Sequence, residues 1–285
     1  MKTKHHTYEF TDRQKEIING CLLGDGTLIR PKRSGWDSNF TETHSTSQAS
    51  LLEWIQKAMK PFPSNLRDTK ARKVNFGREN YNVGLKGFDY KKELYINACP
   101  YFTELEKKWY QRDSNDNYVF KQVGSRLWRI KVVPKDLIMT PTTMRLWFWG
   151  DGYTNIKERK AGFCTQSFTN DEQDFLIEKL KSIDIFTYRY YDKTRSIYTL
   201  KTHAKSFMPL IEMLKQELPK SMEYKVDLSN YTSPKPTILN EELVIKIKQQ
   251  LQNKESPAKI ARDLSIAHYL VRNIKDNRAW NHIKI

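Results

Sequence analysis

The sequence has little of what builds a disulfide framework, a zinc cluster or a membrane span. Its 285 residues include only three cysteines, which lie far apart and form no CxxC pair. No uninterrupted apolar run approaches the ~18 residues that a membrane helix needs. The opening Met-Lys-Thr-Lys-His-His leads into no apolar signal core. We therefore expect an intracellular protein in a reducing compartment.

Acidic residues are also scarce relative to basic ones. Forty-nine Lys and Arg against 33 Asp and Glu leave a formal net charge of +16, which favours a polyanionic partner, either nucleic acid or an anionic membrane surface. Hydrophobic residues at 38% and aromatic residues at 12% suffice for a core, so a wholly disordered chain is excluded.

Two segments of the sequence repeat each other. Ile-Ile-Asn-Gly-Cys-Leu-Leu-Gly-Asp-Gly-Thr at 17–27 is echoed by Arg-Leu-Trp-Phe-Trp-Gly-Asp-Gly-Tyr at 145–153. Each is an apolar helical stretch that runs into Gly-Asp-Gly, and Asp25 and Asp151 lie 126 positions apart (151 − 25). A capping box at Thr11–Gln14 and the pair Thr140-Pro141 predict where the two helices begin. The chain therefore contains an internal repeat.

The segments after each Gly-Asp-Gly follow the same order. In the first half we expect strands over 39–45, 71–77 and 81–86, and helices over 47–60 and 90–98. In the second half we expect strands over 161–168, 185–192 and 196–202, and helices over 170–182 and 203–218. The predicted fold class is α+β, with two pseudo-symmetric αββαββα repeats that pack through their motif helices and carry antiparallel sheets.

A polar, proline-containing stretch separates a small helical tail from the repeats. We predict a first repeat at 1–120, a second repeat at 121–226, a linker at 227–238 and an all-α helix-turn-helix module at 239–285. The residues expected to face outward from the module's recognition helix are His268, Tyr269, Arg272 and Asn273.

The motif residues have a physical rationale as a cation site. Gly20 and Gly24 share one helix face, where another helix backbone can approach closely. Asp25 follows the C-terminal end of its helix, where the helix dipole is unfavourable for a carboxylate. If the second helix packs alongside, Asp151 arrives beside Asp25, and the two carboxylates repel each other unless cations bridge them.

These residues resemble the LAGLIDADG homing endonucleases in their single-chain form with two motifs. The resemblance covers roughly residues 11–226 and includes Leu22–Leu28, 147–152, Thr165-Gln-Ser-Phe168 and Ser221-Met-Glu-Tyr-Lys225. The sequence departs from the family pattern at Leu146, where a small residue is expected, and at Leu23 and Trp149, which replace an earlier acidic position. Both terminal aspartates are kept.

The resemblance implies an activity and a cofactor. Asp25 and Asp151, with Gly24 and Gly150, would hold two or three Mg²⁺ ions, and a monomer would cut both strands of a long DNA target, leaving short 3′ overhangs. Such proteins are commonly encoded within introns. Around the metals, the resemblance places Gln166, on the strand before the second half's helix, and His44 as residues that orient water. It also places Lys86 and Lys201 beside the scissile phosphate.

The basic residues of the strand regions are predicted to contact DNA phosphates or bases. On 126–133, alternation places Arg129 and Lys131 on one strand face. The full set is Arg30, Lys32, Arg33, Lys70, Arg72, Lys73, Arg78, Arg129, Lys131, Arg189 and Lys193.

Simpler interpretations stay open for several of these features. A lone Gly-Asp-Gly is usually a turn after a helix, Lys86 and Lys201 are also compatible with solvated lysines, and Trp147–Trp149 fit core packing. Two other functions are also compatible with the sequence. One is an RNA-binding intron maturase, alone or combined with endonuclease activity, and the other is a DNA-binding regulator that does not cleave. Retention of both aspartates weighs against a maturase without endonuclease activity and against the regulator, while a dual role stays open.

Overall fold

The computed structural model describes residues 9–31, 35–70, 90–229 and 239–283. The chain divides into two compact units, Met1–Tyr231 and Thr232–Ile285. Most of the predicted linker, 230–238, lies outside the described residues. Within the part of the chain that the structure describes, no helix is both long and apolar enough to cross a membrane.

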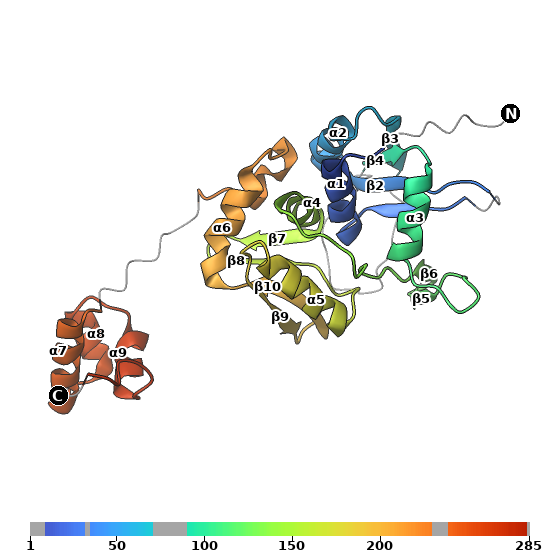
Figure 1. Ribbon diagram of the computed structural model, residues 1–285. Helices are drawn as coiled ribbons and strands as arrows, with labels where there is room; N and C mark the ends of the chain where they lie inside the picture. The colour runs from blue at the N-terminus through green and yellow to red at the C-terminus, as the bar shows by residue number, and fades with distance from the viewer. Residues whose placement is uncertain (1–8, 32–34, 71–89, 230–238, 284–285) are drawn as a thin grey trace. The chain divides into compact units, whose positions relative to one another are not determined.

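The described residues of the first half of the larger unit form three α-helices and a four-stranded antiparallel sheet (Figure 1). The helices are α1 (Asp12–Leu23), α2 (Ala49–Ala58) and α3 (Pro100–Trp109), with a short 3-10 helix η1 (Thr46–Gln48) before α2. The strands are β1 (Thr27–Ile29), β2 (Asn39–Ser45), β3 (Ser64–Lys70) and β4 (Tyr90–Ile96), in the order β1-β2-β4-β3. Helices α2 and α3 pack against this sheet.

The second half repeats this arrangement. Its helices are α4 (Pro141–Asp151), α5 (Asn170–Lys181) and α6 (Ala204–Lys215), followed by a 3-10 helix η2 (Lys220–Lys225). Its strands β7 (Gly152–Asn155), β8 (Lys160–Phe163), β9 (Thr187–Asp192) and β10 (Ile197–Thr202) form a sheet in the order β7-β8-β10-β9. The strand order is the same in both sheets, so the predicted fold class of two αββαββα repeats is confirmed.

A separate two-stranded hairpin lies in the chain between the repeats. It consists of β5 (Phe120–Val123) and β6 (Arg126–Arg129), which pair only with each other among the described strands. The predicted strand over 126–133 is therefore shorter than expected and belongs to neither four-stranded sheet.

The predicted helix over 90–98 is wrong. This segment is β4, in which Leu94 and Ile96 are buried at a spacing of two, while β2 and β3 pair along its two edges. The helix begins later, at Pro100, whose ring suits the first helical position. The strands predicted over 71–77 and 81–86 lie outside the described residues, and the strand β3 before them was not predicted.

The motif helices α1 and α4 begin as the sequence predicts. Thr11 and Gln14 form the capping box of α1. In α4, Thr140 is the N-cap residue before Pro141, and its side chain accepts a hydrogen bond from the Thr143 amide. Both helices are mostly buried, and Trp147–Trp149 are fully enclosed, which confirms their predicted place in the core.

The smaller unit contains three helices, α7 (Glu241–Gln252), α8 (Pro257–Asp263) and α9 (His268–Lys275). Its own apolar core consists of Val244, Ile247, Ile260, Ala261, Val271, Ile274 and Ile283. His268, Tyr269 and Arg272 are exposed and Asn273 is half-buried, as expected for the outer side of α9. The helix-turn-helix identity of this unit stays a prediction.

Helices α1 and α4 pack lengthwise against each other at Gly20. A Cβ added to Gly20 would lie 2.4 Å from the Thr143 carbonyl oxygen and 2.7 Å from the Leu146 Cβ. Leu146, where the family pattern has a small residue, therefore packs directly on the glycine. The contact is lopsided, because one helix supplies the small residue and the other a leucine.

Gly20→Ala is expected to lower the free energy of unfolding by about 1–3 kcal/mol, because the methyl group overpacks a contact between backbones. Gly24→Ala is the matched control: there an added Cβ would meet its nearest neighbour at 3.5 Å, an ordinary contact. Urea unfolding followed by circular dichroism measures both. A Gly20→Ala protein as stable as the wild type would contradict the close approach.

Candidate active site

The ends of α1 and α4 bring Asp25 and Asp151 to the same place. Asp25 follows Gly24, the C-cap of α1, and Asp151 is the last residue of α4. A Cβ added to Gly24 would lie 3.5 Å from the Asp151 Cβ, and one added to Gly150 would lie 3.9 Å from the Asp25 amide nitrogen. Each acid therefore lies beside the end of the other motif helix, as the sequence predicts.

The two carboxyl groups share a partly buried environment that disfavours their charged forms. Partial burial raises the pKa of Asp25, with a further contribution from the charge of Glu42. Burial and then the Asp25 charge raise the pKa of Asp151 to about 6. The pair is therefore short of positive charge, although cationic side chains lie near it.

Lys131 fixes the end of the first motif helix. Its ammonium donates hydrogen bonds of 2.9 Å to the carbonyl oxygens of Gly24 and Gly26. Carbonyls at a helix C-terminus carry partial negative charge, so a cation is favourable there. Burial lowers the pKa of Lys131 to about 8. Lys131 was expected to contact DNA from a strand face, but its ammonium binds the motif backbone instead.

Lys225 does the same for the second motif helix, and the sequence did not predict this role. Its ammonium donates to the carbonyl oxygens of Phe148 at 2.9 Å, Trp149 at 2.6 Å and Gly152 at 2.7 Å. Burial lowers its pKa to about 8. One signal was available: Lys131 and Lys225 each precede a valine in the segment that follows the third helix of a half, α3 or α6.

His44 lies beside Asp25, as predicted. Its Nδ1 is 3.7 Å from an Asp25 carboxylate oxygen, and its Nε2 is 2.8 Å from the carboxylate of buried Glu42. Burial opposes a charged imidazole, but the Glu42 hydrogen bond and the Glu42 and Asp25 charges raise the pKa of His44 overall. Glu42 therefore holds the imidazole in place at the first motif.

The second half has no such pair. Thr27 pairs with Thr41 in the first sheet, and Tyr153 pairs with Gly162 in the second, which makes Thr165 the counterpart of His44. Thr165 is buried. The next residue, Gln166, is exposed in the turn after β8 and not on a strand, because β8 ends at Phe163. The two acids thus have different neighbours.

Two lysines remain among the predicted catalytic residues. Lys201 is on β10 opposite Gly162, and its ammonium lies 3.2 Å from the centre of the Tyr190 ring. Lys86 lies outside the described residues.

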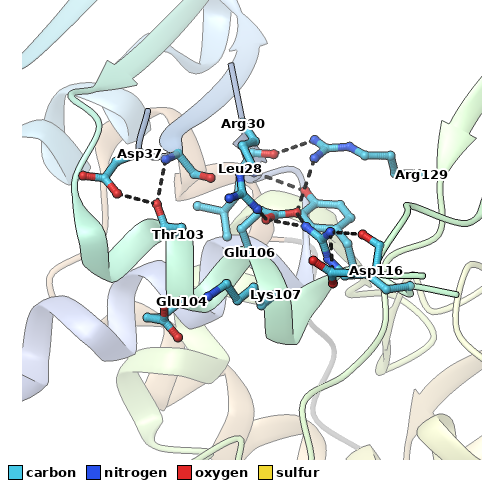
Figure 2. A network of polar contacts seen from close by, with 12 residues as sticks. Leu28, Arg30, Asp37, Thr103, Glu104, Glu106, Lys107, Asp116 and Arg129 are labelled. Carbon is cyan, nitrogen blue, oxygen red and sulfur yellow. Dashed lines mark hydrogen bonds and ion pairs between the residues drawn. The ribbon is translucent and has the colours of Figure 1, made fainter. Parts of the chain in front are cut away.

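The predicted DNA-binding residues fall into three groups. Lys32, Arg33, Arg72, Lys73, Arg78 and the side chain of Lys70 lie outside the described part of the chain. Arg30 and Arg129 lie 3.8 and 3.9 Å from the fully buried carboxylate of Glu106, and Arg189 pairs with Asp174. Lys193 is exposed in the turn between β9 and β10. Arg30 and Arg129 are therefore oriented by internal contacts, which Figure 2 shows.

The fold and the paired acids define a two-repeat α+β protein with one shared acidic centre. Residues 15–210 match the model of the LAGLIDADG DNA endonuclease family, and the chain belongs to that family. The chain is 26% identical over 218 residues to the uncharacterized protein MJ1098 of Methanocaldococcus jannaschii, covering 74% of this chain and 72% of that protein.

A solved structure of the homing endonuclease I-WcaI bound to its DNA recognition sequence has the same fold. It superimposes with a TM-score of 0.57 at 16% identity, over 79% of this chain and 89% of that chain.

Asp151→Asn is expected to stabilise the metal-free protein at pH 7. The folded-state pKa of Asp151 is near 6 and its ordinary value is 3.8, so the ionised carboxylate destabilises the fold above about pH 6. This destabilisation disappears as the pH falls toward 4. The melting temperature at pH 7 should rise by roughly 2 °C or more.

Thermal unfolding in a chelating buffer at pH 7 and pH 4 measures this, with Asp12→Asn as the control. Asp12 is exposed in the first turn of α1, where its carboxylate pairs with Lys15. An Asp151→Asn protein that melts below the wild type at pH 7 would contradict the shared unfavourable environment.

Proposed function

We propose that this protein is a site-specific homing endonuclease that makes a divalent-metal-dependent double-strand break in DNA. The observation that carries the proposal is the contact between the two motif ends, which places Asp25 and Asp151 in one cleft. Family membership and the fold shared with a DNA-bound homing endonuclease support it. Because one chain supplies both acids, a monomer is sufficient to cut both strands. We also propose that cleavage leaves short 3′ overhangs and that the gene is encoded within an intron.

The acid pair fits a hard divalent cation such as Mg²⁺. Burial raises the pKa of both carboxyl groups, and a bound cation would offset this by favouring their charged forms. Among the described residues, no three His, Cys, Asp or Glu side chains gather as a metal-ligating cluster, so the other ligands would be phosphate and water oxygens. Cations held by Asp25 and Asp151 would supply activation of a water and neutralisation of charge on the departing oxygen.

The chain's own groups would prepare this chemistry. Asp25 and Asp151 would bind the ions, while Lys131 and Lys225 fix the backbone that carries the acids. Glu42 orients His44, which would hold a water at the first motif, and Gln166 would do so at the second. Lys201 and Lys86 are proposed to neutralise phosphate charge.

Asp25→Asn and Asp151→Asn are each expected to reduce double-strand cleavage roughly a hundred-fold or more, because each removes a metal ligand. Binding to DNA should survive. The assay incubates the protein and Mg²⁺ with a randomised duplex library and sequences the cut ends, with gel-shift binding in parallel. Asp12→Asn, at the other end of α1, serves as the matched control.

Metal binding has its own readout in this experiment. Mg²⁺ should raise the melting temperature of the wild type and of Asp12→Asn, but should raise it less in either motif variant. Full cleavage by both motif variants would contradict the metal assignment. An intact duplex library with wild-type protein, together with tight RNA binding, would instead favour an intron maturase.

Removal of residues 232–285 is expected to weaken binding to the cleaved duplex without abolishing cleavage. The smaller unit has its own apolar core, so the larger unit should fold without it. A tethered second DNA-binding module adds affinity through its high effective concentration. Equal dissociation constants for the full and shortened chains would contradict a DNA-binding role for this unit.

A further inference from the structure

The hairpin β5–β6 lines the same cleft as the paired acids. The cleft has a volume of about 370 Å³. Its walls include Asp25, Asp151, Tyr110, Lys121, Trp128 and Lys131. An element that belongs to neither repeat therefore supplies a large aromatic and a cationic side chain next to the acids.

Lys121 and Trp128 share one face of the hairpin. They are directly opposite each other in the β5–β6 register, so their side chains emerge on the same side. Trp128 is 53% exposed, which is unusual for so large an apolar side chain. Leu127, its neighbour along β6, emerges on the opposite side and is 70% exposed.

The hairpin is anchored by Arg129. Its guanidinium carbon lies 4.1 Å from the centre of the Tyr110 ring, and it donates a hydrogen bond to the Leu28 carbonyl. Its other guanidinium nitrogen lies 3.9 Å from the carboxylate of Glu106, which also accepts two hydrogen bonds from Arg112 (Figure 2). These contacts tie the hairpin to β1 and α3, and they hold the Lys121–Trp128 face beside the cleft.

The chemistry of this face suits a nucleic-acid strand. An aromatic ring offers a surface to the sugar and base, and a lysine beside it offers a counter-charge to the phosphate. Asp25 and Asp151 alone would repel a phosphate, so cationic groups on the cleft wall are needed to admit one. The net charge of +16 makes a polyanionic occupant favourable.

We propose that the Lys121–Trp128 face is a DNA contact at the cleavage centre. Trp128 packs against the sugar or base next to the scissile phosphate, and Lys121 pairs with a phosphate of the same strand. This inference rests on the proposed endonuclease function and extends it to a surface outside the two sheets. The hairpin then holds the strand in register with the acids.

Trp128→Ala tests the aromatic contact. In an Asp151→Asn background, which keeps the DNA intact, it should weaken binding to the duplex recovered from the cleavage library about five-fold or more. Trp128→Phe should stay within about two-fold because it keeps an aromatic face. Leu127→Ala is the matched control and should bind as the background does. Lys121→Ala should lower the salt dependence of binding by about one phosphate contact.

Equal binding by Trp128→Ala and Leu127→Ala would overturn the inference while leaving the endonuclease proposal in place. Absence of any cleaved duplex with wild-type protein would refute that proposal itself, and a random-sequence 40-base-pair duplex then serves as the binding probe. Hydroxyl-radical footprinting of unmutated protein gives a second readout. The duplex should protect Trp128 from modification and should not protect Leu127. Equal protection of both residues would also overturn the inference. So would protection of Trp128 by RNA but not by the duplex.

Discussion

The close approach of two helix ends is the constraint on which the rest of this molecule depends. At Gly20 the helix α1 has no side chain, and the Thr143 carbonyl and Leu146 of α4 fill the space; at the helix end, Asp151 lies in ordinary contact with Gly24. The same approach forces two carboxyl groups into one partly buried cleft, which raises the pKa of both. The buried aromatic residues of α4 offset this cost, because their packing holds the helices together.

A lysine side chain binds the end of each motif helix. Lys131 follows the hairpin between the two halves, and Lys225 is the last residue of η2 at the end of the second half. Both bind carbonyl oxygens at the end of a motif helix. The ammonium groups therefore fix the backbone on which the acids stand, and they leave the carboxylates in need of a further cation. The charges of Lys131 and Lys225 lower the pKa of both acids, but burial outweighs them and the pKa of each acid stays raised.

Local sequence signals predicted the parts of the fold that depend on local physics. The capping box at Thr11 and the proline at 141 fix where α1 and α4 begin, and the repeated Gly-Asp-Gly fixed the pairing of the acids. The helix prediction over 90–98 failed because residues 90–96 form a strand by pairing with β2 and β3, and a local sequence pattern does not contain that pairing. Gln166 was misplaced for a related reason, since the end of β8 is set by its partners β7 and β10.

The two halves share a fold, but the residues around their motif acids differ. This is possible because both halves belong to one chain. Asp25 faces an imidazole that Glu42 orients, whereas strand register places Phe163 and Thr165 at the corresponding positions near Asp151. Burial and the Asp151 charge raise the pKa of Cys164 to about 11, so its neutral thiol adds no charge there. In a symmetric homodimer every change would occur twice. Here each acid has acquired its own surroundings, so the strand held at each one would meet a different set of groups.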